Sequence, residues 1–580
     1  MTVADVDVLV VGAGPAGLST AVLLGRLGIS TRVVERRAAG SAHPKAHVVN
    51  ARTMELFRQW GVADEVRDAA LPLDRGIGVG WVTRLTGIEI GRITAADAPD
   101  EWDRMCADSS EALVSCPQDR IEPILLAAAR RLGVRVDFGV EATGLGQTPA
   151  GVDVRVRRAA DGGTETVRAR YVVAADGARS PVRELLGIGN DAVAPVGHLL
   201  NAYVDADLGP YTGDRPYALW WILNARTQGA MIALDGKRRW TYNFAFDPER
   251  ESIADYPPER CAGLFREAVG VPDLAVTVRS VLPWKLEIAI AERFRAGRVF
   301  LVGDAAHRFP PTGGFGMNTG IQDAHNLAWK LAAVLRGWAG EELLAGYEDE
   351  RMPVARVNAA QSMRNAERMA GTGALFTDPS VLASIEDAAG KDLRAALAAG
   401  IPAQRDHFLF QGQTFGHVYR SAAVVPDGTL APRSTVAEYR MEAHPGALAP
   451  HTWFRTPEGA RRATVDLSAD TFVLLAGAEG RAWVEAADVA SRRLGVPIAA
   501  FRVGADGDLV AEADGWRHVW GITPHGCVLV RPDGHVALRV PGAGADGVAD
   551  LIPALRAVLG RRAEAEAPAD TLDPADPAFP

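Results

Sequence analysis

The residues that first point to chemistry form a glycine-rich turn near the N-terminus. The turn lies between the apolar run 8–11 and a helical pattern over 15–28, and it consists of Gly12, Ala13, Gly14, Pro15, Ala16 and Gly17. Glycine at the first, third and sixth places permits a tight turn, close approach of the backbone to a pyrophosphate, and close packing of helix against strand. Free N–H groups at the start of a helix bind phosphate oxygens. The pattern therefore predicts a dinucleotide-binding turn.

An acidic residue stands where such a turn requires one. A second strand over residues 31–34 ends at Glu35, where a carboxylate can accept hydrogen bonds from ribose hydroxyls. We include the adjacent Arg36 in the predicted cofactor site. Residues 542–547 repeat the glycine spacing but lie too close to the C-terminus for a second parallel strand to follow. We interpret that repeat as a loop.

A second glycine-rich segment lies far along the chain, over residues 299–324. A strand over 298–302 would deliver Asp304 to a cofactor, and two prolines stiffen the following backbone by fixing φ. A helix beginning near Thr319 would aim its positive end at this loop and stabilise an anion there. Close approach of the loop to an aromatic ring is made possible by Gly313, Gly314 and Gly316.

A third segment lies between these two. A strand ends at Asp176, and a helix then begins with Ser180 and Arg183, which together could contact a dinucleotide. Further upstream, Gln118 stands in the segment 116–120. Read alone, the third segment is an ordinary strand–turn–helix unit, and its position between the other two gives it weight.

In this order, the segments resemble the signature motifs of the class A flavoprotein monooxygenases, the para-hydroxybenzoate hydroxylase family, over residues 5 to about 360. The family uses the second segment to bind FAD and links the third to both FAD and nicotinamide binding. The resemblance implies bound FAD, with NADPH or NADH as a transient co-substrate and O2 as the oxidant. It further implies a flavin C4a-hydroperoxide that transfers an electrophilic oxygen to an electron-rich aromatic carbon.

The same resemblance implies the site residues. The expected cofactor-binding residues are Gly12, Gly14, Pro15, Ala16, Gly17, Glu35, Arg36, Gln118, Asp176, Asp304, Pro311, Gly314, Gly316, Met317 and Asn318. The candidates for a catalytic role are Arg52, Pro311 and Asn318. A conspicuous protein base is not required, because the substrate's own phenolate or enol supplies much of the activation. We interpret His43 and Lys45 as residues of a solvated loop, and His307 as a packing or hydrogen-bonding residue.

A second group of strands could build the substrate pocket. Residues 220–223, 229–234 and 239–246 alternate in strand fashion and carry many aromatic side chains. A sheet laid over the flavin ring would offer the apolar walls that a small aromatic substrate needs. The candidate substrate-binding residues are Trp221, Trp240, Tyr242 and Phe315. Ordinary core packing is the alternative for each strand residue.

The patterns together predict an α/β protein with a Rossmann-like FAD-binding domain, a β-sheet substrate domain and a C-terminal thioredoxin-like domain. We expect the FAD-binding domain over residues 1–75, 110–185 and 290–400, and the substrate sheet over 76–109 and 190–289. Residues 413–560 comprise a linker and the C-terminal domain, whose strand and helix order resembles the appendage of phenol and natural-product hydroxylases. Because it lacks a CxxC pair and Cys527 stands alone, we expect no dithiol activity. We expect residues 561–580 to be disordered.

Composition excludes several other classes of protein. The 580-residue chain has a net charge of −10 and no long basic run, which argues against nucleic acid as a partner. Its four cysteines show no metal-like spacing, so we expect no metal and a reducing compartment. The N-terminus enters a strand without a signal peptide, and no apolar run could span a membrane. We therefore expect a cytoplasmic monomer or homodimer acting on a small aromatic or polyketide substrate.

Within the family, three segments resemble actinomycete tailoring hydroxylases of polyketide and indolocarbazole skeletons, a group that includes the rebeccamycin-pathway flavin hydroxylase. They are 315–320, 415–420 and 528–535. Alternatives are a Baeyer–Villiger or epoxidising monooxygenase, an antibiotic-inactivating or phenol-catabolic hydroxylase, and a flavin-binding protein that only sequesters an unstable intermediate. The tryptophan signature and catalytic lysine of flavin-dependent halogenases are not evident.

Overall fold

The computed structural model describes residues 5–71, 78–215, 217–370, 372, 378–468, 470–542 and 547–561. It has a mixed α/β fold, as the sequence predicts, with two large sheets and a smaller C-terminal group of strands. The expected disordered tail, apart from Arg561, lies outside the described residues.

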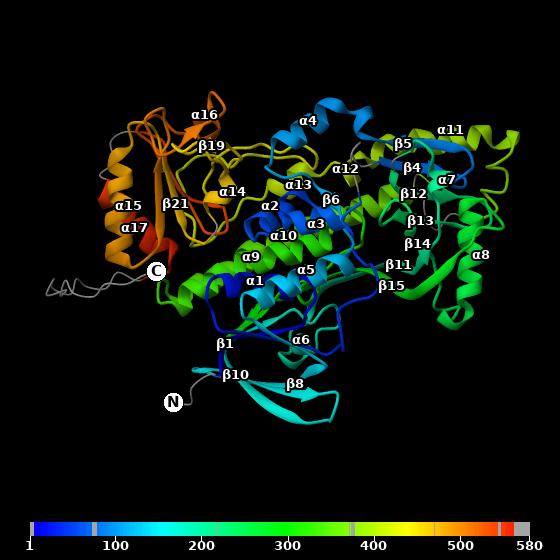
Figure 1. Cartoon of the computed structure of the whole chain (residues 1–580), viewed down its shortest axis with the longest axis horizontal. Helices are drawn as coiled ribbons and strands as arrows, with labels where there is room; N and C mark the ends of the chain where they lie inside the picture. Colours follow the sequence, from blue (N-terminus) through cyan, green and yellow to red (C-terminus); the bar gives the residue numbers. More distant parts are fainter. Residues whose placement is uncertain are drawn as a thin grey trace.

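The first sheet is mostly parallel and lies in the lower half of the molecule (Figure 1). Its strand order is β16-β17-β10-β1-β2-β7, with β9 and β8 attached through β10. Val10 of β1 pairs with Val33 of β2 on one side and Val173 of β10 on the other. The strands are β1 (Val6–Val11), β2 (Thr31–Glu35), β7 (Arg135–Phe138), β8 (Val140–Thr148), β9 (Gly151–Arg158), β10 (Thr164–Ala174), β16 (Arg295–Ala296) and β17 (Val299–Leu301).

Helices pack on the first sheet, and its strands have continuous apolar sequences because they are buried. Helix α1 (Pro15–Arg26) packs against both α5 (Gln118–Arg131) and α9 (Phe315–Leu335), and α10 (Gly346–Ala370) runs beside α9. Strands that are buried on both faces of a parallel sheet have continuous apolar sequences. Val8, Leu9 and Val10 are accordingly fully buried.

The second sheet has eight strands in the order β18-β15-β11-β14-β13-β12-β4-β5 and lies at the right of Figure 1. Neighbouring strands are antiparallel except for the pair β12 and β4. Helix α8 (Pro258–Val269) packs against one face. The strands are β4 (Gly78–Val82), β5 (Glu89–Ile93), β11 (Asn190–Asp205), β12 (Tyr217–Leu223), β13 (Gln228–Ala233), β14 (Arg239–Ala245), β15 (Thr277–Ala291) and β18 (His307–Arg308).

The C-terminal part lies at the opposite end of the molecule from this second sheet (Figure 1). Its central sheet has the order β22-β21-β24-β25, with α15 (Arg481–Leu494) and α17 (Gly547–Val558) packed together against it. A three-stranded sheet β20-β19-β23 lies alongside. The strands are β19 (Trp453–Arg455), β20 (Arg461–Ala463), β21 (Phe472–Ala476), β22 (Ile498–Arg502), β23 (Val510–Ala511), β24 (Cys527–Val530) and β25 (Val536–Val540).

Shorter elements connect these layers. The two-stranded pair β3 (Val48–Val49) and β6 (Val114–Ser115) lies between the N-terminal segments. The remaining helices are α2 (Ala51–Gln59), α3 (Ala63–Ala69), α4 (Pro99–Ala107), α6 (Pro181–Leu185), α7 (Gly209–Thr212), α11 (Lys391–Gly400), α12 (Arg405–Phe408), α13 (Gln411–Phe415), α14 (Thr464–Leu467) and α16 (Trp516–Trp520).

One predicted boundary is wrong. Helix α9 begins at Phe315 rather than near Thr319, because Gly313 and Gly314, with φ of 103° and 67°, are the last residues with positive φ before it. The four residues after Gly314 contain no proline, and nothing prevents the helix from including them. The helix therefore starts inside the glycine-rich segment and brings Gly316 and Met317 into its first turn.

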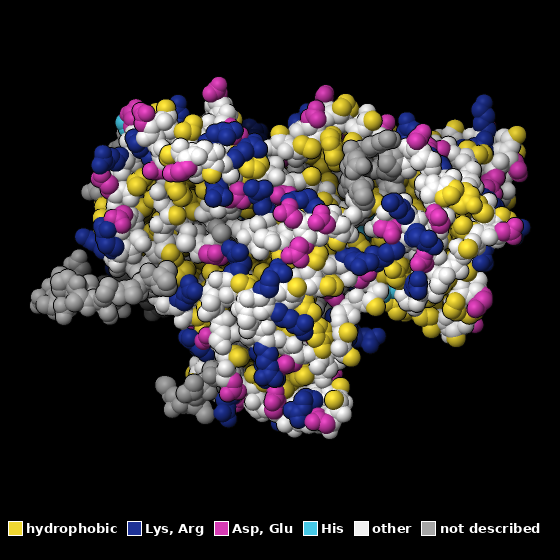
Figure 2. All heavy atoms as spheres, in the orientation of Figure 1, with side chains coloured by type: hydrophobic (Ala, Val, Ile, Leu, Met, Phe, Trp, Pro, Cys, Tyr) yellow, Lys and Arg dark blue, Asp and Glu magenta, His cyan; other side chains and the backbone are white. Residues whose placement is uncertain are grey.

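The surface mixes charges of both signs. Figure 2 shows Lys and Arg side chains interspersed with Asp and Glu over the visible face, without a continuous basic field. No helix in the described part of the chain is long and apolar enough to cross a membrane. The same residues contain no group of three His, Cys, Asp or Glu side chains that could hold a metal ion.

Candidate cofactor and substrate site

A cavity of about 1230 Å³ lies between the first sheet and the second. This volume exceeds the range typical of a site for a single small ligand. Its walls come from all three predicted cofactor segments and from the second sheet. The expected cofactor residues that line it are Gly12, Gly14, Pro15, Ala16, Glu35, Arg36, Gln118, Asp176, Asp304, Pro311, Gly314, Gly316 and Met317. The structure thus gathers segments that are nearly 300 residues apart around one space.

The three glycines of the N-terminal turn, Gly12, Gly14 and Gly17, have different structural roles. Gly12 has φ of 108°, and a Cβ there would lie 2.2 Å from the carbonyl oxygen of Ala175. A Cβ on Gly17 would lie 2.0 Å from the carbonyl oxygen of Gly12, so these two glycines serve close packing and Gly17 is not at the cavity wall. Gly14 lines the cavity, and a Cβ there would meet nothing within 4 Å. The free space before Gly14 and the start of α1 fits a pyrophosphate.

Glu35 ends β2 at the cavity wall and is nearly buried. Its carboxylate accepts a hydrogen bond of 2.8 Å from the backbone N–H of Ala13 and one of 2.9 Å from the side chain of Arg37. Burial alone would raise its pKa, but these hydrogen bonds outweigh burial and lower the pKa of Glu35. The group is therefore an ionised acceptor, which suits ribose hydroxyls.

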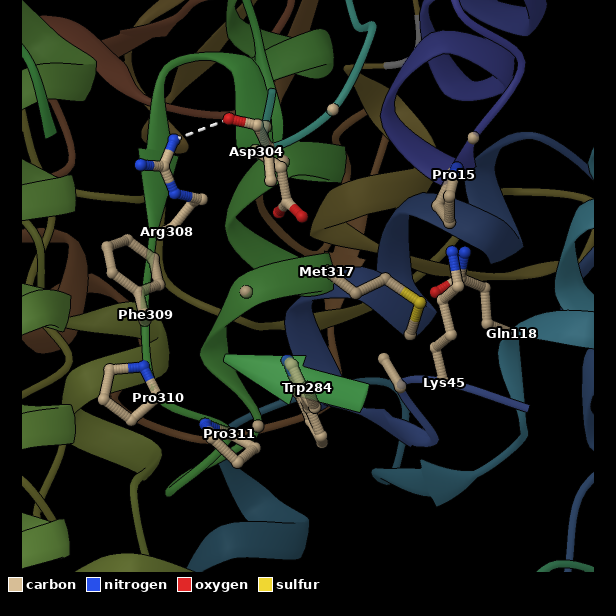
Figure 3. Close-up of a pocket in the computed structure, with 18 of the residues that line it drawn as sticks. Pro15, Lys45, Gln118, Trp284, Asp304, Arg308, Phe309, Pro310, Pro311 and Met317 are labelled. Carbon is tan, nitrogen blue, oxygen red and sulfur yellow. Dashed lines mark hydrogen bonds between the residues drawn. The ribbon is translucent and has the colours of Figure 1, made fainter. Parts of the chain in front are cut away.

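Asp304 points its carboxylate into the cavity from the segment that follows β17 (Figure 3). The side chain is exposed to the open cavity, yet desolvation by the surrounding protein raises the pKa of Asp304. Nearby, Arg308 donates to the carbonyl oxygen of Ala178 at 2.7 Å and to Glu287 at 2.8 Å, which ties the segment to the turn after β10. Figure 3 also places Pro311, Met317, Lys45 and Gln118 at the cavity wall.

Asn318 holds the loop before α9 in place. Its side-chain oxygen accepts from the backbone N–H of Asn50 at 3.0 Å, and its amide nitrogen donates to Val48 at 2.9 Å and Gly314 at 2.7 Å. The side chain is 2% exposed and is not among the residues lining the cavity. These contacts give Asn318 a role in fixing the loop.

Asp176 is fixed by the start of α6. It accepts a hydrogen bond of 2.6 Å from the hydroxyl of Ser180 and one of 2.9 Å from the backbone N–H of Val182, while burial raises its pKa. Among the described residues, Ser180 is the one non-glycine residue with positive φ, at 22°. The tight turn brings Asp176 to the cavity wall.

Only one of the four aromatic candidates for substrate binding lines the cavity. Trp221 does so from β12. Trp240 and Tyr242 face the opposite side of the sheet and pack in the core against α8, because side chains alternate along a strand. Phe315 is buried, and its ring packs edge-on against Phe410 with centroids 5.6 Å apart.

Arg52, a catalytic candidate, lies away from the cavity. Its guanidinium donates to Glu55 at 2.9 Å and to the backbone carbonyl of Asp533 at 2.9 Å. The side chain is 6% exposed and connects α2 to the turn between β24 and β25. This contact with a residue 481 positions later in the chain could not be expected from local pattern.

His43 is buried at 7% exposure, so its interpretation as a residue of a solvated loop is wrong. Its ring lies between Ser280 and Asn201 of the second sheet, which satisfy both ring nitrogens.

Asn201 and Asn243, which line the cavity, were not predicted as site residues. Each is a polar residue at an alternating position among apolar ones, and this pattern could have identified them. His307 makes the predicted buried hydrogen bond, to Asp323 at 2.6 Å.

A buried histidine that lines the cavity leads to a prediction about acid stability. Burial lowers the pKa of His407 from 6.5 to about 4. In the unfolded chain, His407 binds a proton below about pH 6.5, whereas in the folded chain it stays neutral down to about pH 4. The free energy of unfolding therefore falls as pH decreases through this window. Replacing His407 with glutamine is expected to remove up to about 3 kcal/mol of this acid destabilisation. The measurement is the melting temperature of the wild-type protein and of the His407→Gln variant from pH 7.5 to pH 4.5. Parallel curves of melting temperature against pH for the two proteins would contradict the prediction.

Two family models match the chain. The FAD binding domain model matches residues 5–362, and the aromatic-ring hydroxylase C-terminal model matches residues 442–562. The chain belongs to the family of FAD-binding aromatic-ring hydroxylases, and the predicted resemblance is confirmed. It is an enzyme of the monooxygenase class with FAD as its cofactor.

Individual proteins resemble the chain over nearly its whole length. Tetracenomycin A2 monooxygenase-dioxygenase of Streptomyces glaucescens is 36% identical, covering 97% of this chain and 98% of its own. Aklavinone 12-hydroxylase RdmE of Streptomyces purpurascens is 39% identical, covering 96% and 99%. The flavin-dependent monooxygenase PieE, solved with FAD and substrate, superposes with a TM-score of 0.89 at 33% identity, covering 97% and 100%. RebC with bound 7-carboxy-K252c superposes with a TM-score of 0.81 at 33% identity, covering 97% and 100%.

Proposed function

We propose that this enzyme uses FAD and NAD(P)H to hydroxylate a polycyclic aromatic substrate of the polyketide type in secondary metabolism. One observation carries the proposal: a single cavity joins the dinucleotide-binding turn to an apolar sheet that carries Trp221. A cofactor held at the first wall would face a flat ligand held at the second. Relatives that act on tetracenomycin and aklavinone support an aromatic polyketide as the substrate.

Different residues of the chain would bind different parts of FAD. The turn at Gly14 and the start of α1 bind the pyrophosphate, and Glu35 and Arg36 hold the adenosine ribose. Asp304 and the backbone from Pro311 to Met317 hold the flavin end. When bound and reduced by NAD(P)H, FAD supplies activated oxygen from O2. The apolar wall of the second sheet keeps water from the reacting atoms.

The finer parts of the predicted fold join this proposal. Parallel strands β10, β1 and β2 with the glycine turn after β1 support a Rossmann-like FAD-binding domain. The order β22-β21-β24-β25, with β21 and β22 parallel and two helices on one side, supports a thioredoxin-like C-terminal domain. The proposed domain limits remain those drawn from the sequence. The cytoplasmic location and the monomeric or homodimeric state stay predictions.

The test begins with the visible spectrum of the purified protein and continues with NADPH and NADH oxidation in the presence of polyhydroxylated aromatics. A flavin spectrum with substrate-stimulated oxidation is the expected result. Bound flavin without stimulation by any candidate would favour a protein that sequesters an intermediate. Absence of flavin after reconstitution with FAD would contradict the proposal. Hydroxylation is preferred to Baeyer–Villiger oxidation or epoxidation because a relative's name specifies a hydroxylase.

A further inference from the structure

Two asparagines interrupt the apolar face that the second sheet turns to the cavity. Asn201 of β11 and Asn243 of β14 are directly paired across neighbouring antiparallel strands. Both line the cavity and are 5% exposed. Their neighbours on this wall are Leu199, Leu219, Trp221, Ala230 and Ile232. A buried amide is costly unless its hydrogen bonds are satisfied, so this pair requires an explanation.

The hydrogen bonds of the pair have one consistent direction. The backbone carbonyl of Ala230 can only accept, so the amide nitrogen of Asn243 donates to it at 3.4 Å. The side-chain oxygen of Asn243 then accepts from the amide nitrogen of Asn201 at 2.6 Å. The side-chain oxygen of Asn201 in turn accepts from Nε2 of His43 at 2.9 Å. These hydrogen bonds form a row that runs from His43 through Asn201 and Asn243 to the carbonyl of Ala230. Every donor in this row points along the sheet away from His43.

His43 stands at the start of this row. Its Nδ1 lies 2.7 Å from the hydroxyl of Ser280, which donates to that nitrogen when the ring is neutral and Nε2 carries the proton. Burial has the largest effect and lowers the pKa of His43; the hydrogen bond with Asn201 opposes it, and the charge of Lys45 lowers the pKa further. A neutral ring with Nε2 protonated holds the oxygen of Asn201 toward itself. Ser280 is not among the cavity-lining residues, so this support lies outside the site.

Counting hydrogens leaves two donors unused. Each amide nitrogen carries two hydrogens, and Asn201 and Asn243 each donate one of them within the row. No described residue accepts the second hydrogen of either amide. Both side-chain oxygens already accept a hydrogen bond. Because paired residues in neighbouring strands have Cβ atoms about 5 Å apart, the wall offers two adjacent N–H donors.

We propose that Asn201 and Asn243 bind carbonyl or phenolate oxygens on one edge of a planar aromatic substrate, with His43 and Ser280 as positioning residues. This inference rests on the proposed function and specifies which substrates the site accepts. An edge that carries acceptor oxygens satisfies the two donors. An edge of bare hydrocarbon or of N–H groups leaves buried donors unpaired and is rejected.

The probe is 1,8-dihydroxyanthraquinone, whose colour reports ionisation of its phenol. It is titrated into the FAD-loaded enzyme and into the Asn243→Leu variant, with affinity and the apparent pKa of the bound phenol both read from visible absorbance. N–H donors stabilise the phenolate, so the wild-type protein is expected to lower that pKa. The variant is expected to bind about tenfold more weakly and to raise the pKa of the bound phenol by about one unit.

Controls separate hydrogen bonding from packing. Ile232→Leu changes the same wall without a polar atom and is expected to leave the pKa of the bound phenol unchanged. Ser280→Ala, outside the cavity, is expected to weaken binding a few-fold through His43. If Asn243→Leu fails to retain FAD, Ser280→Ala carries the test. If Asn243→Leu and Ser280→Ala both bind the probe with wild-type affinity and leave the pKa of the bound phenol at its wild-type value, the binding role of the two asparagines is overturned. The proposed function is not affected by that result. No binding of the probe to the wild-type enzyme would overturn both.

Discussion

Replacing Gly14 with valine is expected to abolish tight FAD binding while the apoprotein stays folded. Gly14 has φ of −79° and ψ of −178°, an extended conformation that any residue adopts. A Cβ there meets no atom within 4 Å, so the empty fold accommodates the side chain. The same space is where we place the pyrophosphate, and overfilling a packed contact typically costs about 1–3 kcal/mol. FAD affinity is therefore expected to fall about a hundredfold.

A matched glycine makes this result interpretable. Gly146 also has free space around its Cβ position, but it is exposed on β8 and does not line the cavity. Gly146→Val should bind FAD as the wild-type protein does. Fluorescence titration of FAD into each apoprotein, with a melting curve for each, provides the measurement. Wild-type FAD affinity in the Gly14 variant would remove the turn from the cofactor site.

The second large effect is expected from Arg531→Met, which should destabilise the junction between α10 and the C-terminal strands. Arg531 lies in the turn after β24 and has no exposed side-chain surface. It forms two hydrogen bonds of 2.7 and 2.8 Å with Glu350 of α10 and also contacts Asp533. Lys330 of α9 contacts the same Glu350 at 2.6 Å. These groups form one buried ion cluster.

Removing one member of such a cluster leaves charge buried without its partner. Arg531 and Lys330 hold the pKa of Glu350 well below its usual range despite burial, so the carboxylate is ionised. Loss of the guanidinium is expected to cost about 3–5 kcal/mol, and lysine at 531 should restore only part of it. Arg481→Met, which removes an exposed ion pair with Glu485, is the control and should leave the melting temperature nearly unchanged. Equal melting temperatures for the two variants would contradict this account of the junction.

The parts of the site that the sequence predicts are those encoded by short contiguous patterns. The turn from Gly12 to Gly17 and the segment around Asp304 each combine a strand, glycines and a helix within about 25 residues. Their backbone requirements appear directly as residue types. These segments meet at one cavity because the carboxyl ends of neighbouring parallel strands β1, β10 and β17 lie at the same edge of a sheet.

What the sequence could not provide depends on contacts between distant segments. Arg52 contacts the backbone of Asp533, and no periodicity in either segment announces that pairing. The orientation of Trp240 and Tyr242 toward α8 depends on which face of the sheet meets the cavity, and this follows from the packing of the whole sheet. Once Trp221 is placed at the cavity, however, alternation and strand pairing also place Asn201 and Asn243 there.

The most direct test of the central claim is incubation of the FAD-loaded enzyme with NADPH, a hydroxylated polycyclic aromatic and ¹⁸O2, followed by mass spectrometry of the product. We expect one ¹⁸O atom in the product, with NADPH consumed only when the aromatic is present. Product oxygen derived from water, or NADPH consumption that leaves the aromatic unchanged, would contradict the assignment of this enzyme as an aromatic hydroxylase.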